Sequence, residues 1–129
     1  MCFGHQKGKK MFPSNLYNRS YPKPRRSPSD ILRWMAGRRV RFSVSGQSMT
    51  PTLQEGLFVF VDTKRQVQKG DIVILQHPEN THIVVIKRCI ALSDNLIWIE
   101  GDNPPQSTDS RQWGWLPLAS LIGVCTSIL

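Results

Sequence analysis

Two neighbouring apolar runs decide the fold of this chain. Residues 71–76 read Asp-Ile-Val-Ile-Leu-Gln, and residues 81–92 read Thr-His-Ile-Val-Val-Ile-Lys-Arg-Cys-Ile-Ala-Leu. The intervening residues 77–80 read His-Pro-Glu-Asn, a composition typical of turns. Short runs rich in β-branched residues, joined by such a turn, predict two paired β-strands.

Similar runs continue on both sides of this pair, and helical patterns are almost absent after residue 40. Tight turns such as Gln54-Glu55-Gly56 and Ser93-Asp94-Asn95 separate the runs. The sequence therefore predicts a mostly β protein, built as a small, coiled and barrel-like β-sheet. The further strands are expected at Val40 to Val44, Leu57 to Val61, Leu96 to Glu100 and Leu121 to Ile128.

The chain of 129 residues is long enough for one compact domain, which we expect to span residues 29–129. Residues 1–28 are polar and rich in proline, so they predict a flexible basic arm. Ser29 and Asp30 are expected to cap a short helix that stops at Gly37. Packing of this helix on the body is the default, and contact with a membrane surface is the alternative.

The positive charge lies mainly at the N-terminal end. The chain has 17 Lys and Arg residues against 9 Asp and Glu residues, a formal net charge of +8. Eleven of the basic residues fall within residues 1–41, where Asp30 is the only acid. A basic arm on a slightly acidic body suits an anionic surface, an acidic partner or a targeting role better than a nucleic-acid groove.

Cysteine and histidine spacing indicates neither disulfides nor a metal site. Cys2, Cys89 and Cys125 are odd in number, and the histidines at positions 5, 77 and 82 lack ligand spacing. A reducing compartment, the cytoplasm, is therefore expected, with no metal and no cofactor. The apolar runs are far shorter than the ~20 residues of a membrane span, so membrane contact is expected only at the periphery, through the basic arm.

Two residues carry the candidate chemistry. The stretch Ser45-Gly-Gln-Ser-Met-Thr-Pro-Thr-Leu53 presents Ser48 on a turn ahead of an apolar run. Lys87 lies inside a second apolar run, where burial would lower the pKa of its amine toward ~7 to 8 and let it act as a base. Taken singly, Ser48 is more simply a turn serine, and Lys87 more simply a lysine that reaches water.

The ordered combination of three blocks changes this balance. Residues 46–53 read Gly-Gln-Ser-Met-Thr-Pro-Thr-Leu, residues 70–73 with 86–88 read Gly-Asp-Ile-Val and Ile-Lys-Arg, and residues 101–111 read Gly-Asp-Asn-Pro-Pro-Gln-Ser-Thr-Asp-Ser-Arg. Over most of residues 40–128 the chain resembles the serine-lysine peptidases that include type I signal peptidases. The resemblance implies the signal-peptidase catalytic core.

The resemblance also implies a role for each matching residue. Ser48 would be the nucleophile, Lys87 the general base, and Ser107 the hydroxyl that orients the lysine amine. Asp109 and Arg111 would form a supporting ion pair. Gly46, Gln47, Met49 and Pro51 would shape the nucleophile loop. The Ser48 N–H would be one oxyanion donor, with the second left open between Ser45 and another backbone N–H.

The departures from the secretory enzymes indicate a subtype. The residues after Arg88 lack the usual Pro-Gly-Asp segment, and a large inserted β domain is absent. The compact core and residues 101–111 resemble the nickel-type superoxide dismutase maturation proteases. The expected substrate is then the N-terminal leader of a precursor superoxide dismutase.

Three alternatives stay open. One is a type I signal peptidase-like enzyme that cleaves secretory preproteins, and another is a repressor-type autoprotease, which the missing helix-turn-helix disfavours. Outside enzymes, the chain could be a catalytically inactive basic binding module, because a correct motif does not establish a lowered lysine pKa.

Overall fold

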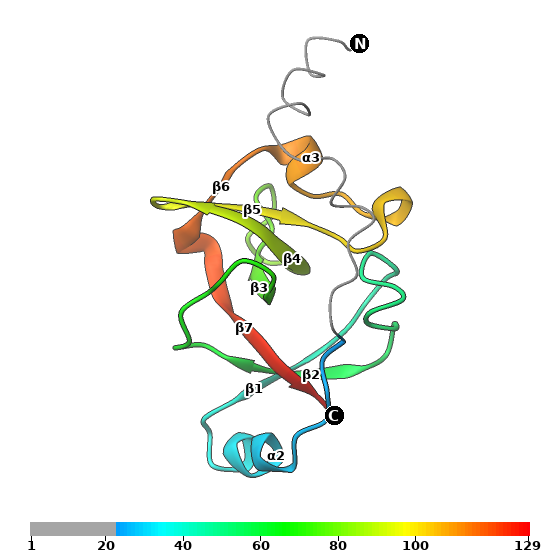
Figure 1. The fold of residues 1–129 in the computed structure, drawn as a ribbon, viewed down its shortest axis with the longest axis vertical. Coiled ribbons are helices and arrows are strands. Elements are labelled where there is room, and N and C mark those ends of the chain that lie inside the picture. The colour runs from blue at the N-terminus through cyan, green and yellow to red at the C-terminus, as the bar shows by residue number, and fades with distance from the viewer. Residues whose placement is uncertain (1–22) are drawn as a thin grey trace.

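The computed structural model describes residues 23–129, so most of the predicted arm (1–28) lies outside the described residues. The described part of the chain forms one curled antiparallel sheet in the order β1-β2-β7-β3-β4-β5-β6 (Figure 1). The mostly β, barrel-like fold expected from the sequence is confirmed. The strands are β1 Val40–Ser43, β2 Phe58–Asp62, β3 Ile72–Gln76, β4 Val84–Ser93, β5 Leu96–Glu100, β6 Leu116–Pro117 and β7 Leu121–Ile128.

Strand β3 lies in the middle of the sheet, between β4 and β7, and is buried on both faces. Its side chains alternate between two hydrophobic clusters, with Val73 and Leu75 in one and Ile72 and Ile74 in the other. This alternation explains why its sequence is continuously apolar rather than half polar.

The sheet curls because its pairing register shifts at three places, between Phe60 and Val61, between Ile74 and Leu75, and between Cys89 and Ala91. Such irregularities bend a strand and increase its twist. The curl brings the loop between β1 and β2 toward the segment that follows β5. The candidate active site is built from these two segments and β4.

The expected short helix is present as α2, Pro28–Met35, but its N-cap differs from the prediction. Ser27, not Ser29, is the cap, and Pro28 takes the first helical position, where a missing N–H costs no hydrogen bond. Gly37 follows the helix with a φ of 78°, as expected of a helix stop.

Asp30 of α2 has a buried side chain that joins the helix to the sheet. Its carboxylate accepts hydrogen bonds from the hydroxyls of Thr126 and Ser127 in β7, both at 2.6 Å. Arg39 donates a further bond at 3.1 Å. Asp30 is therefore a tertiary anchor rather than the N-cap that the sequence suggested.

A second short helix, α3 at Ser110–Trp113, interrupts the expected strand and loop pattern. Asp109 caps it, and the side chain of Gln112 accepts a bond from the Asp109 N–H, which completes a capping box. Two 3₁₀ turns, at Pro104–Gln106 and Leu118–Ser120, flank this region. The helix fixes Asp109 beneath the candidate site.

Candidate active site

Ser48 lies in the loop between β1 and β2, and the side chains on either side hold that loop to the core. Met49 and Leu53 are 1% and 0% exposed and belong to the cluster that contains Ile72 and Ile74. The Leu53 N–H donates to the Met49 carbonyl at 2.8 Å, and Thr50 and Pro51 are joined by a cis peptide bond. The loop therefore presents a half-buried serine from a well-packed base.

Lys87 lies in β4, opposite Val73 of β3, and its side chain is buried with 5% of its surface exposed. Its Nζ donates a hydrogen bond to Ser107 Oγ at 3.0 Å. The simpler expectation of a lysine that reaches water is therefore wrong here. Burial lowers the pKa of the Lys87 amine below its ordinary 10.5, the carboxylate of Asp109 raises it, and the charge of Arg111 lowers it again.

Asp109 lies under Ser107 and is completely buried. It accepts hydrogen bonds from the Ser107 hydroxyl and from the Gly101 N–H, the latter at 2.8 Å. The expected ion pair with Arg111 is present, with the Arg111 Nε at 2.9 Å from Asp109 Oδ1. Burial raises the pKa of Asp109, but the bonds from Arg111, Gly101 and Ser107 outweigh it and hold that pKa below 3.8.

Gly101 occupies the point where the Ser48 loop and Ser107 converge. A Cβ atom at this position would lie 2.6 Å from the Ser48 carbonyl oxygen and 2.6 Å from the Ser107 Cβ. Both distances are shorter than van der Waals contact, so only glycine allows the two segments to approach this closely. The Lys87 amine, bonded to Ser107, is thereby held beside the Ser48 loop.

The sequence analysis assigned no role to Asp102 and Asn103, which the structure places against the Ser48 loop. The Asn103 amide donates to the Gln47 carbonyl at 2.9 Å and to the Thr50 hydroxyl at 2.8 Å. Its backbone N–H donates to the Ser48 carbonyl at 2.9 Å. Asn103 therefore holds the loop at three residues, Gln47, Ser48 and Thr50.

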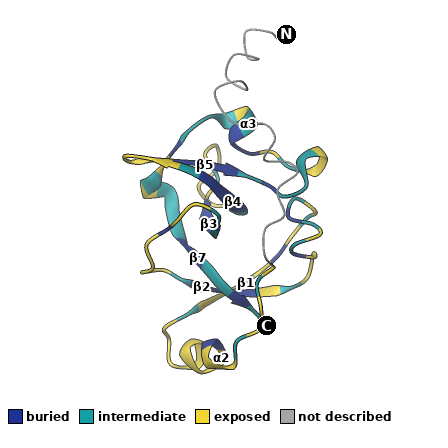
Figure 2. Cartoon of the chain, viewed as in Figure 1, coloured by how far each residue is buried: buried dark blue, intermediate teal, exposed yellow. Residues whose placement is uncertain are grey.

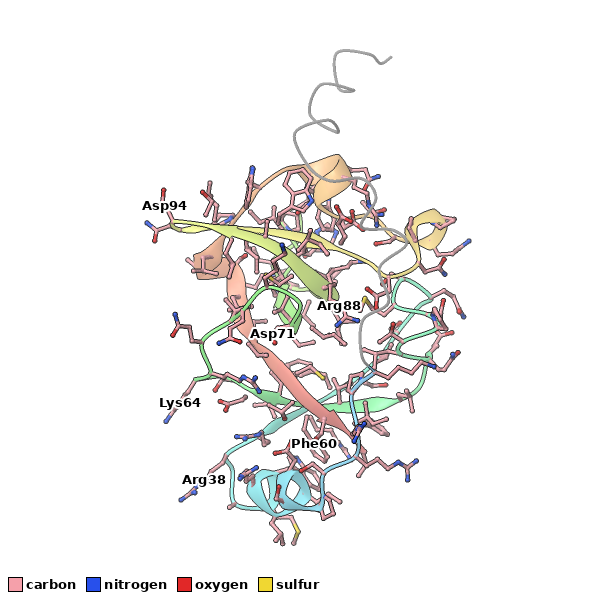
Figure 3. The ribbon with its side chains drawn as sticks, in the orientation of Figure 1. Arg38, Phe60, Lys64, Asp71, Arg88 and Asp94 are labelled. Carbon is pink, nitrogen blue, oxygen red and sulfur yellow. The ribbon has the colours of Figure 1, made fainter. Side chains whose placement is uncertain are left out.

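Asp102 joins the same loop to the residue after Lys87. Its carboxylate accepts a hydrogen bond from the Thr52 hydroxyl and pairs with the Arg88 guanidinium at 2.7 Å. Arg88 is 2% exposed, and Figure 3 shows its side chain inside the molecule. The partners of Asp102 and Asn103 lie 14 to 56 residues away in the sequence, so local patterns could not reveal these contacts. Their place in the quoted block 101–111 was the one available signal.

Ser48 and Lys87 line the same open pocket, which has a volume of about 160 Å³. Its walls are mainly apolar and come from β1, the Ser48 loop, β3 and the first half of β4. An extended apolar segment fits such a lining better than a charged one. The lining residues are Phe42, Ser43, Ser45, Ser48, Ile74, Val84, Val85, Ile86 and Lys87.

The Gly46 N–H, next to the nucleophile turn, is already engaged. It donates to the Glu55 carboxylate at 2.9 Å, with Gly46 at a φ of 80°. Ser45 lines the pocket together with Ser48. The second oxyanion donor was left open between Ser45 and another backbone N–H; the Gly46 N–H is already bonded to Glu55, and Ser45 lies at the pocket.

Two further features bear on function. Among residues 23–129, no group of three or more His, Cys, Asp or Glu side chains could hold a metal ion. In the same part of the chain, every helix is too short or too polar to cross a bilayer.

The described chain combines a curled antiparallel β-sheet with a buried lysine and a loop serine that line one apolar pocket. Residues 38–101 match the family described as signal peptidase, peptidase S26. The segment that contains Ser48 and Lys87 is therefore similar to the signal peptidase family.

The chain is also similar to mitochondrial inner membrane protease subunits. It is 33% identical to subunit 1 of Mus musculus, over 61% of this chain and 62% of the relative. It is 32% identical to subunit 2 of Mus musculus, over 67% and 64%, and to subunit 1 of Schizosaccharomyces pombe, over 57% and 62%. The chain thus spans less than two thirds of the length of these relatives.

Proposed function

We propose that this protein is a serine endopeptidase that removes N-terminal leaders from precursor proteins, in the manner of a signal peptidase. One observation carries the proposal. Lys87 is buried, has a lowered pKa and is bonded to Ser107, in the same pocket that Ser48 lines. The match of residues 38–101 to the signal peptidase family supports the same chemistry.

The proposed reaction has two steps. The neutral Lys87 amine takes the Ser48 hydroxyl proton as Ser48 Oγ attacks the scissile carbonyl, and the lysine then gives that proton to the leaving amine. The product is an ester between Ser48 and the leader. Lys87 next takes a proton from water, the hydroxide attacks the ester, and the proton returns to Ser48 Oγ.

The surrounding residues would keep Lys87 oriented and neutral. Ser107 accepts one N–H of the amine, which leaves the lone pair free to face Ser48. Asp109 fixes the direction of the Ser107 hydroxyl by accepting a hydrogen bond from it. Because Arg111 pairs with Asp109, the negative charge that would otherwise favour the ammonium form of Lys87 is largely compensated.

The developing oxyanion would be stabilised by the Ser48 N–H and by a second donor on the Ser45 side of the pocket. The leader itself would bind in extended form along the pocket wall. Two exposed apolar residues, Val84 at the start of β4 and Ile83 just before it, would contact the leader.

The comparisons favour secretory or membrane-associated precursors as substrates. The relatives are mitochondrial inner membrane protease subunits, so they support the signal-peptidase alternative better than maturation of a nickel superoxide dismutase. They also favour association with a membrane, and a location at the mitochondrial inner membrane, over the cytoplasm. Because the relatives are named as subunits, activity should be assayed with and without a partner subunit.

The test is a cleavage assay read by mass spectrometry. The full chain is incubated with a mitochondrial inner membrane precursor, a secretory preprotein and a nickel superoxide dismutase precursor, beside Ser48→Ala and Lys87→Ala. A single cut at a leader junction, lost in both variants, is expected with the first substrate. Cleavage of the superoxide dismutase precursor alone would restore that substrate, and equal cleavage by Ser48→Ala would overturn the proposed mechanism.

A further inference from the structure

Helix α2 and the two strands beside it expose a continuous group of large apolar side chains. Leu32 and Met35 are 68% and 73% exposed, far more than is usual for such residues in a folded domain. Figure 2 shows α2 almost entirely in the exposed colour. We call this surface the α2 patch; its apolar members are Ile31, Leu32, Trp34, Met35, Val40 and Phe58.

Arginine side chains surround these apolar groups. The Arg41 guanidinium lies 4.9 Å from the centre of the Trp34 ring and 4.5 Å from that of Phe58, which joins helix and strands into one surface. Arg33 and Arg38 are exposed on the same side of the fold. Figure 3 shows Arg38 beside α2, pointing away from the body.

The two acidic groups near the α2 patch, Asp30 and Asp62, are both paired with Arg39. Asp30 is 2% exposed and is bonded to Arg33, Arg39 and two hydroxyls of β7. Asp62 pairs with Arg39 at 3.4 Å. Arg39 therefore compensates the nearby carboxylates, and the charge that α2 and β1 present to solvent is positive.

We propose that the α2 patch docks on the surface of an anionic lipid bilayer. Exposed Leu, Met and Trp side chains would enter the headgroup and acyl boundary, while the arginines contact lipid phosphates. A tryptophan, aliphatic groups and a basic rim, with the nearby carboxylates paired to Arg39, fit such a surface by charge as well as by apolarity. The proposal is independent of whether Ser48 is catalytic.

The position of β1 gives this docking a consequence for the pocket. Arg41 belongs to the α2 patch, whereas Phe42 and Ser43, the next residues of the strand, line the pocket that holds Ser48. Successive strand residues rise by about 3.3 Å, so the patch and the pocket entrance lie within roughly 10 Å along β1. A bilayer bound at the patch would present membrane-adjacent chain segments to the pocket.

The test is co-sedimentation of the full chain with vesicles. Phosphatidylcholine vesicles are compared with mixed phosphatidylcholine and phosphatidylglycerol vesicles, at low and high salt. The expected result is binding to the mixed vesicles that weakens with salt. Leu32→Ser combined with Met35→Ser should weaken binding at least about tenfold, and Arg38→Glu should weaken it several-fold.

Matched controls separate the α2 patch from exposed leucines and exposed basic residues elsewhere on the surface. Leu92→Ser with Leu96→Ser removes two leucines, each 39% exposed, at the β4–β5 hairpin. Lys69→Glu makes the same charge change as Arg38→Glu at an exposed site on another loop. Both controls should bind as the unmodified chain does, and circular dichroism should show that every variant is folded.

Three results would overturn the proposal. One is the absence of binding to mixed vesicles, and another is unchanged binding by the Leu32→Ser and Met35→Ser variant, which would place the lipid contact elsewhere. The third is a pair of results: light scattering shows that the unmodified chain self-associates, and the Leu32→Ser and Met35→Ser variant loses this self-association but still binds vesicles. That result would identify a second copy of the chain as the occupant. Ser48→Ala should bind vesicles normally, so failure of the peptidase proposal would be seen separately.

Discussion

The Gly101 backbone lies against the Ser48 carbonyl oxygen so closely that a Cβ atom on Gly101 would be 2.6 Å from that oxygen. The same Cβ would collide with the Ser107 side chain. One backbone position therefore sets the distance between the loop that carries the proposed nucleophile and the hydroxyl that holds Lys87. The closeness of these two segments gives the first prediction.

Gly101→Ala should reduce cleavage strongly, because the Ser48 loop or Ser107 must move to admit the methyl group. The accompanying loss of stability should be about 1–3 kcal/mol, typical of overpacking. Gly123→Ala is the matched control, since its Cβ would collide with Val61 and the Asp62 carbonyl, away from the pocket. If the activity per folded molecule fell equally in both variants, a specific role for Gly101 would be contradicted.

Asp102 should matter for both stability and activity, and its two partners allow the effects to be separated. Asp102→Ala leaves the buried Arg88 guanidinium without its carboxylate, so we expect a loss of about 3–5 kcal/mol in urea unfolding. Thr52→Val removes only the link to the Ser48 loop and should lower kcat with a change of about 1 kcal/mol in stability. A Thr52→Val enzyme with normal kcat would show that this link does not position Ser48.

The proposed base should impose a pH dependence on cleavage. Because the pKa of Lys87 is lowered from 10.5, kcat/KM should rise with pH through that lowered pKa. Asp109 raises the pKa of Lys87 and Arg111 lowers it. Asp109→Asn should therefore move the rising limb to lower pH, and Arg111→Gln to higher pH. Shifts in the same direction for both variants would exclude Lys87 as the titrating group.

The same pKa predicts a pH effect on stability. Between its lowered folded pKa and 10.5, Lys87 binds more protons in the unfolded chain than in the folded one, so the free energy of unfolding should rise with pH across that interval. Lys87→Met removes the titrating amine at similar volume and should lack this rise. Chemical denaturation of both proteins across the interval measures it.

Asp30 should stabilise the attachment of α2 to the sheet. Burial raises the pKa of Asp30, but the bonds from Ser127, Thr126 and Arg33 and the charge of Arg39 outweigh it and lower that pKa below 3.8. Its contribution is therefore present above 3.8 and lost as the pH falls through the folded pKa. Asp30→Ala should cost about 3 kcal/mol at neutral pH, whereas Glu79→Ala, at an exposed turn, should cost almost nothing.

Much of the fold could be predicted because the apolar runs are short, β-branched and bounded by turns. Six of the twelve predicted strand ends coincide with the observed ends and five differ by one residue; the start of β4 differs by three, because Thr81 to Ile83 precede the strand. Helix α3 was missed because its four residues are too few to show a period. Its capping box, Asp109 with Gln112, was the available signal.

From the sequence, the candidate site could be proposed only at residues whose own side chains are chemically reactive. Ser48, Lys87 and Ser107 are reactive types in quoted blocks, whereas Asp30 looked like a cap because its partners lie 96 and 97 residues away. The contacts of Asn103 with the Ser48 loop depend likewise on how the sheet curls. Pairings over such separations follow from the register shifts of the strands, which apolar periodicity does not encode.

The measurement that tests the central claim most directly is trapping of the acyl-enzyme. A leader peptide that the protein cleaves is mixed with it, the reaction is stopped with acid within the first turnover, and the digested protein is mapped by mass spectrometry. The account predicts an added mass equal to the leader fragment on the peptide that contains Ser48, and none with Ser48→Ala. An adduct on another residue, or full turnover by Ser48→Ala, would contradict it.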